Sequence, residues 1–127
     1  MAGLRTMKEK MPKFMFLQYV DESSAPRPGT PEMHAEVEAY GKLFQDVSGA
    51  GILRGGDPCQ PSATAFSVQV RDGKTQVSDG PMFKQSPWLN GYWVFDCKDR
   101  EEAVAWAAKI PAAHGSGAVE VHPIFEM

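Results

Sequence analysis

The chain has 127 residues, of which 43% are hydrophobic and 23% are charged, and its formal net charge is -3. These values are typical of one globular domain that is large enough to bury a core. Lys and Arg form no cluster, which argues against a surface for nucleic acid or for an anionic membrane. No apolar run is long enough to cross a bilayer. We therefore expect a cytoplasmic protein with neither nucleic acid nor a membrane as partner.

The first elements predicted are a flexible N-terminal extension over residues 1–11 and then a single domain over residues 12–127. The beginning of the chain shows neither helical nor strand periodicity, which is typical of an extension without regular structure. The segment KFMFLQYV, residues 13–20, is rich in aromatic and long apolar side chains. It predicts a first strand, followed by a polar loop.

A long amphipathic helix is predicted after this loop. Thr30 can accept a hydrogen bond from a free backbone N–H group, and Pro31 suits the first helical position, where its missing N–H costs nothing. Gly49 and Gly51 are expected to end the helix. Apolar residues recur at spacings of three and four and predict one buried stripe, composed of Met33, Val37, Tyr40, Phe44 and Val47.

The second half of the chain predicts a hairpin, two strands and a second helix. Segments 64–70 and 74–78 flank a turn in which Gly73 can supply the required positive φ angle. Asp99 and its capping-box partner Glu102 begin a helix with a stripe composed of Ala103, Trp106, Ala107 and Ile110. Strands are expected at 91–95 and 117–125. With a short strand after the first helix, this order predicts an α+β fold of the ferredoxin-like sandwich type, with two helices on one face of an antiparallel sheet.

Two of the predicted strands are apolar on both faces. The alternating sets are Phe14 and Phe16 against Met15, Leu17 and Tyr19, and Tyr92 and Val94 against Trp93 and Phe95. Two helices cover only one face of such a sheet, and soluble monomers rarely leave the other face apolar and exposed. We therefore expect a homodimer that packs sheet against sheet.

Polar residues on the last strand are a first candidate site. Glu120 and His122 share one face of this strand and would point into the dimer cleft if Val119 and Val121 lie under the helices. A carboxylate beside an imidazole is a possible acid/base pair. The alternative is a solvated pair at the edge of the sheet, which is the commoner situation for charged residues.

Three blocks of the sequence, residues 14–19, 55–81 and 78–127, resemble the DGPF-type branch of the YCII-related proteins. The last block begins SDGPMFKQSPWLNGYWVF. The resemblance implies a ferredoxin-like fold that dimerises into a body of the dimeric α/β-barrel type. Some members of this branch are associated with sigma factors, so the resemblance also implies a possible link to them. The broader YCII proteins are suggested to be enzymes with a His-Asp pair in the cleft, so it implies that activity as an alternative.

Carried over by position, the Asp-Gly-Pro motif of this branch falls on Asp79, Gly80 and Pro81, and the histidine of the broader YCII pattern falls on His34. The Phe that follows the motif is replaced by Met82, with Phe83 one place later. FKQSPW replaces the acidic and Thr-containing stretch that usually comes next. Asp79 can serve as a general base or only as the cap of a turn. His34 can belong to a site or only form a surface pair with Glu38, one helical turn away.

The other residue types with reactive side chains predict less. Cys59 and Cys97 are expected to be reduced, buried and inert thiols. The histidines have no metal-binding spacing, so we expect neither a metal nor a cofactor. Trp88, in a predicted loop, can line a pocket or seal the mouth of the barrel.

From the sequence we expect a dimer that binds a small organic molecule in a cleft at the dimer interface. Asp79, His34 and His122 are the candidate acid/base residues, and Glu120, Tyr92 and Trp88 are the candidate ligand-binding residues. The alternative is a non-enzymatic interaction or regulatory module linked to transcription that depends on a sigma factor.

Overall fold

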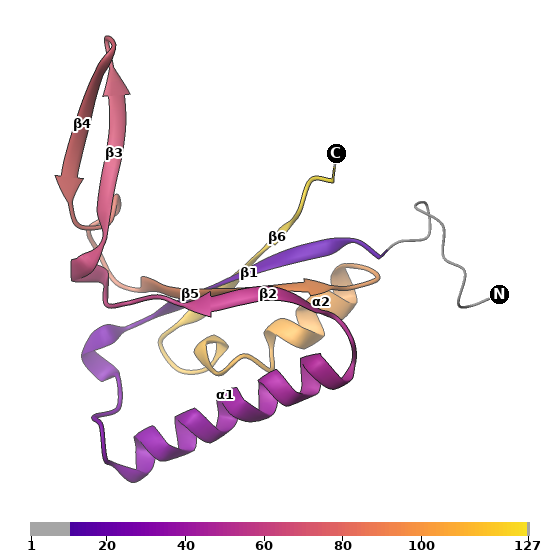
Figure 1. The fold of residues 1–127 in the computed structure, drawn as a ribbon. Coiled ribbons are helices and arrows are strands. Elements are labelled where there is room, and N and C mark those ends of the chain that lie inside the picture. The colour runs from indigo at the N-terminus through magenta and orange to yellow at the C-terminus, as the bar shows by residue number, and fades with distance from the viewer. Residues whose placement is uncertain (1–10, 127) are drawn as a thin grey trace.

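The computed structural model describes residues 11–126 and shows an α+β fold (Figure 1). Its elements are β1 (Lys13–Val20), α1 (Pro31–Gly49), β2 (Leu53–Pro58), β3 (Phe66–Arg71), β4 (Lys74–Asp79), β5 (Trp88–Asp96), α2 (Arg100–Ala107) and β6 (Ala118–Pro123). The predicted bounds of the first strand and the first helix are confirmed. The prediction for Trp88 is wrong, because this residue begins β5 rather than lying in a loop.

The larger sheet has the strand order β2-β5-β1-β6, and each neighbouring pair is antiparallel. Both helices lie on the same side of this sheet (Figure 1). With β3 and β4 regarded as an insertion, this is the ferredoxin-like arrangement, and the predicted fold class is confirmed. In the part of the chain that the structure describes, no helix is long and apolar enough to span a membrane.

Both helices begin at the residues that the sequence indicates. The Thr30 side chain accepts a hydrogen bond from the Met33 backbone N–H at 3.2 Å, and the Asp99 side chain accepts one from Glu102 at 2.9 Å. Such caps satisfy backbone donors that have no partner within the helix, and each contributes about 1 kcal/mol to stability. The caps therefore fix where each helix starts relative to the sheet.

The core lies between the sheet and the two helices. Phe16 and Phe95 face each other with ring centroids 4.7 Å apart, and the Val47 and Ile110 side chains are also fully buried. Burying each of these side chains contributes roughly 1.5–3 kcal/mol. This layer holds α1 against the sheet.

The predicted stripe of α1 is partly wrong. Leu43 and Val47 are its buried residues, whereas the Val37 and Phe44 side chains are 60% and 53% exposed. The stripe is rotated by about one residue because α1 crosses the sheet with Tyr40 and Leu43 facing inward. Phe44 is left at the border of a pocket, described below.

The hairpin β3-β4 forms a sheet of its own and extends away from the body on the side opposite the helices (Figure 1). One of its faces carries Phe66, Val68, Val70, Thr75, Val77 and Asp79, and the other carries serines, glutamines and charged residues. Its apolar side chains are exposed, with Phe66 at 69% and Val77 at 63%. The hairpin is therefore amphipathic without covering the core.

Within residues 11–126, no helix lies on the second face of the larger sheet (Figure 1). Cross-strand pairing places Leu17 beside Tyr92 and Glu120, and Met15 beside Val94 and His122. We call this surface the open face. It is the surface through which the sequence predicts dimerisation, and it combines an apolar centre with the Glu120–His122 pair at one edge.

Candidate functional site

Two adjoining pockets lie between α1 and the end of the sheet where β1 finishes and β5 begins. Their volumes are about 340 and 520 Å³. Both values fall in or near the range of roughly 300–1,000 Å³ that is typical of small-molecule sites. Both pockets are lined by Glu36, Tyr40 and Asn90. These three residues therefore form a shared wall.

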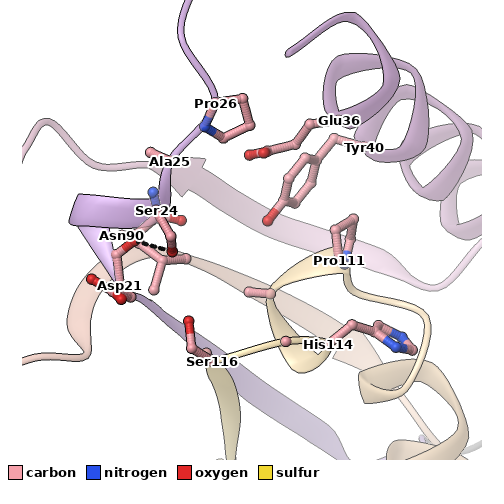
Figure 2. Close-up of a pocket in the computed structure, with 14 residues that line it drawn as sticks. Asp21, Ser24, Ala25, Pro26, Glu36, Tyr40, Asn90, Pro111, His114 and Ser116 are labelled. Carbon is pink, nitrogen blue, oxygen red and sulfur yellow. Dashed lines mark hydrogen bonds between the residues drawn. The ribbon is translucent and has the colours of Figure 1, made fainter. Parts of the chain in front are cut away.

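The larger pocket has an apolar side formed by Phe44, Leu53 and Trp93, and its border on β2 includes Gly55 and Gly56. The smaller pocket lies beneath the loop after β1 and beside the turn after α2. Its lining includes Asp21, Ser24, Pro26, Pro111 and Ser116, as Figure 2 shows.

A buried glutamine connects the shared wall to the core. The Gln18 side chain lies on the helix side of β1, and the residue is 5% exposed. Its oxygen accepts a hydrogen bond from Trp93 Nε1 at 2.9 Å, and its nitrogen donates to Asn90 Oδ1 and, at 3.4 Å, to the Tyr40 hydroxyl. Buried polar groups are costly unless they are paired, and here every Gln18 side-chain atom that can form a hydrogen bond has a partner.

Tyr40 and Glu36 lie one helical turn apart on α1 and project toward the loop that follows β1 (Figure 2). Burial is the main cause that raises the pKa of the Tyr40 hydroxyl, and the negative charge of Glu36 adds to the shift. Hydrogen bonds from Gln18 and from the Ala112 backbone act in the opposite direction. At neutral pH the Tyr40 hydroxyl therefore keeps its proton and is available as a donor.

His114 lines the smaller pocket, but its ring points away from the centre (Figure 2). Its Nε2 lies 2.8 Å from the Ala108 carbonyl oxygen, so this nitrogen carries the proton and donates it to the backbone. The imidazole therefore holds the turn after α2 in place.

The structure places Asp79 at the end of β4, opposite Phe66, and the residue is exposed. Its backbone carbonyl accepts a hydrogen bond from Lys84 Nζ at 2.8 Å, and the next N–H, of Gly80, donates to the Ala65 carbonyl at 2.7 Å. Within residues 11–126, the Asp79 carboxylate accepts no hydrogen bond and lines neither pocket. The backbone, rather than this carboxylate, holds the Asp-Gly-Pro turn.

The two histidine candidates each have a carboxylate partner. His34 Nε2 lies 2.8 Å from Glu38 Oε1 on the exposed side of α1, and His122 Nε2 lies 2.8 Å from Glu120 Oε2 on the open face. All four side chains are more than half exposed. Because His34 and His122 lie on opposite sides of the sheet and Asp79 lies on the hairpin, a single chain does not bring the three together.

Among the predicted ligand-binding residues, Tyr92 is on the border of the larger pocket, and its hydroxyl donates to Asp57 Oδ2 at 3.2 Å. Trp88 is partly buried where β5 begins, opposite Val20, and lines neither pocket. Glu120 contacts Tyr19 across the open face, and burial followed by the charge of Glu120 raises the Tyr19 pKa. The sequence thus located one residue of the pocket border.

The shared wall was not predicted from the sequence, although one signal for it exists. Gln18 occupies the third inward position of β1, after Phe14 and Phe16, where an apolar residue is expected. A polar side chain at a core position requires partners, and those partners are pocket residues. Glu36 and Asn90 carry no comparable signal.

The cysteines differ in their surroundings. Cys97 is fully buried, and burial together with nearby carboxylates raises its pKa to about 12. Cys59 is exposed, so its predicted burial is wrong. Among the described residues there is no group of three or more His, Cys, Asp or Glu side chains arranged to hold a metal ion.

The fold defines this chain as a small α+β protein of the ferredoxin-like class, with a pocket between its first helix and its sheet. The family model of the YCII-related domain matches residues 12–127, and the chain belongs to that family. It is 32% identical, over 65 residues, to a protein of Rhizobium meliloti (strain 1021) that is described as uncharacterized. The match covers 50% of this chain and 52% of that relative, so the chain matches about half of the relative's length.

Proposed function

We propose that this protein binds a small organic molecule in the two pockets between α1 and the sheet. The observation that carries this proposal is the buried Gln18. Its side chain forms hydrogen bonds with Trp93, Asn90 and Tyr40 and so orients these residues at a pocket wall. A core packed only for stability favours an apolar residue at this position. A few oriented polar groups beside an apolar surface are typical of ligand pockets.

The same wall offers an acid/base pair. Tyr40 retains a proton that it can donate, and Glu36 is a carboxylate that can accept one. Both residues line both pockets, so a ligand in either reaches them. Proton transfer on a bound molecule is therefore the reaction type that this wall supports best.

We further propose that the protein is a homodimer formed through the open face. Met15, Leu17, Tyr19, Tyr92 and Val94 remain only partly buried in one chain, although they occupy the middle of the sheet. A second copy packed on this face would remove them from water. The amphipathic hairpin extends on the same side of the sheet and would lie beside that second copy (Figure 1).

A non-enzymatic interaction module is a second candidate function, and the hairpin favours it. A two-stranded sheet is marginally stable in water, yet this one exposes Phe66, Val68, Val70 and Val77 on a single face. That face is suited to another protein, in line with the regulatory role that the resemblance to the DGPF-type branch implies. The two functions differ in the surface used: a small molecule would bind in the pockets beside α1, and a protein partner would bind to the apolar face of the hairpin.

Small-molecule binding can be tested by NMR titration of the ¹⁵N-labelled protein with neutral aromatic fragments. We expect shifts at Tyr40, Asn90 and the Trp93 indole N–H, weakened in Phe44→Ser. The matched control is Val37→Ser, because Val37 is an exposed apolar residue of α1 that lines neither pocket. Equal binding by both variants, or shifts confined to the hairpin, would contradict the proposal.

A further inference from the structure

The hydrogen bonds around Gln18 have a defined direction that starts at Trp93. An indole N–H is a donor and never an acceptor, so the side-chain atom of Gln18 that faces Trp93 Nε1 is the oxygen. The Gln18 nitrogen therefore faces the pocket side, where it donates to Asn90 Oδ1 and to the Tyr40 hydroxyl oxygen. Trp93 thus fixes which end of each amide faces which neighbour.

The consequence for the wall is that its two neutral residues, Asn90 and Tyr40, offer donors to the pocket. Asn90 uses its oxygen on Gln18, and Tyr40 uses its oxygen as acceptor for Gln18 and for the Ala112 backbone. Within the described residues, no protein group accepts a hydrogen bond from Asn90 Nδ2 or from the Tyr40 hydroxyl. Two donors on one wall match an oxygen acceptor of a ligand.

The acidic side chains that line the pockets further restrict the class of ligand. Glu36 is shared by the two pockets, Asp57 borders the larger one and Asp21 borders the smaller one. Among residues 11–126, no Lys or Arg lines either pocket. A carboxylate or phosphate ligand would be repelled by the negative charges of these three side chains. The apolar side formed by Phe44, Leu53 and Trp93 is suited to a hydrocarbon or aromatic body.

We propose that the pocket takes a neutral carbonyl compound, whose oxygen accepts hydrogen bonds from Asn90 Nδ2 and the Tyr40 hydroxyl while its apolar body lies against Phe44, Leu53 and Trp93. This inference rests on the proposed function and adds the class of ligand to it. Gln18 is a positioning residue, which acts through Asn90 and Tyr40. Trp93 contacts the ligand and also orients the Gln18 amide.

Three probes with the same ring test the inference: acetophenone, ethylbenzene and benzoate. They present a neutral carbonyl oxygen, no acceptor and an anion, respectively. In NMR titrations of the full chain we expect acetophenone to bind about three- to tenfold more tightly than either of the others, the gain expected from one or two hydrogen bonds. The Asn90 side-chain N–H₂ peaks should shift with acetophenone alone.

Asn90→Asp is the sharpest variant, because a carboxylate still accepts the hydrogen bond from Gln18 but has no N–H to donate. We expect it to fold and to lose the preference for acetophenone. Gln18→Glu is a second variant: a Glu side chain accepts from Trp93 but cannot donate, so the Asn90 amide should reverse. The same preference should then disappear, with a change in the Asn90 side-chain peaks.

The outcomes separate the inference from the proposed function. Equal binding of acetophenone and ethylbenzene at the pocket would leave the binding function in place and overturn the carbonyl assignment. An unchanged preference in Asn90→Asp, with Tyr40→Phe also unchanged, would overturn it as well. Pocket peaks that respond to none of the three probes would count against the pocket as a ligand site, and so against both proposals.

Discussion

Gly91 lies directly opposite Gln18 across the β1–β5 pair, and its missing side chain leaves the space that the Gln18 amide occupies. A Cβ atom at this position would lie 3.3 Å from Gln18 Nε2 and 3.1 Å from the Asp57 carbonyl oxygen. The β2 backbone on one side and the hydrogen-bonded Gln18 amide on the other leave little room for a side chain at position 91. The wall of the pocket thus depends on a glycine in the middle of a strand.

Gly91→Ala should therefore destabilise the protein by about 1–3 kcal/mol, the usual cost of an overpacked core, and move the Trp93 indole N–H peak. Gly41→Ala is the matched control. A Cβ at Gly41 meets no other described residue within 4 Å, and Ala in the middle of α1 should stabilise the protein by about 0.5–1 kcal/mol. Urea unfolding measures both variants, and a neutral Gly91→Ala would contradict the close fit.

Arg54 and Asp96 form an ion pair that connects β2 to the end of β5. Arg54 Nε and Nη2 lie 2.8 and 2.7 Å from Asp96 Oδ2, and Oδ1 of the same carboxylate is buried without a partner in the described chain. Arg54→Met should cost about 1–3 kcal/mol because it leaves a buried carboxylate unpaired.

The double variant Arg54→Met/Asp96→Asn should recover part of this loss, since it removes the unpaired charge. Lys42→Met is the control: it breaks the exposed Lys42–Asp46 pair of α1 and should change the free energy of unfolding by about 0.5 kcal/mol or less. If the separate effects of Arg54→Met and Asp96→Asn on the free energy of unfolding add up to the effect of the double variant, Arg54 and Asp96 do not interact.

Cys97 and Cys59 should differ in their reactivity toward thiol reagents. The raised pKa of Cys97, about 12, keeps it protonated as well as buried, whereas Cys59 is exposed. Iodoacetamide at pH 8 should modify one thiol in the native protein and both in urea. Rapid labelling of Cys97 in the native state, identified by mass spectrometry, would contradict the buried position.

The same pKa predicts a pH dependence of stability. Because folding raises the Cys97 pKa above its ordinary value of 9.0, the folded state holds this proton more tightly than the unfolded state. The contribution to stability is complete below pH 9 and is lost as the pH rises toward 12. Cys97→Ala should flatten this part of the curve when unfolding is measured against pH.

Asp79→Asn should change the free energy of unfolding by about 0.5 kcal/mol or less. It should leave the binding of a fragment to the pocket unchanged. Its carboxylate is exposed and lines neither pocket. Glu36→Gln is the comparison, because Glu36 lines both pockets and its substitution should alter binding. Loss of binding in Asp79→Asn would return Asp79 to the site.

The proposed homodimer can be tested by sedimentation at micromolar concentration. The unsubstituted protein should sediment as a dimer, and Leu17→Lys, at the centre of the open face, should sediment as a folded monomer. Val104→Lys is the matched control, because Val104 is an exposed apolar residue of α2 on the other side of the sheet. A monomeric unsubstituted protein would sink the proposal.

The sequence by itself determined the fold class and most of the elements. Thr30, Pro31 and Asp99 specify helix starts through local hydrogen bonds and backbone geometry, which do not depend on distant contacts. Alternation in residues 13–20 likewise specified which side chains of β1 share a face, and the structure shows that Phe14, Phe16 and Gln18 face the helices. Local physics of this kind is readable from a single chain.

Only the tertiary structure decided where the site lies and how its groups are arranged. Gln18, Tyr40 and Asn90 come from three elements, and their distances depend on how α1 crosses the sheet. The rotation of α1 that buries Leu43 and exposes Phe44 follows from packing in the core, whereas helical spacing alone predicted Phe44 in the buried stripe. The direction of the hydrogen bonds from Trp93 to the pocket exists only after these elements have met, because a donor acquires its acceptor through the packing of the whole chain.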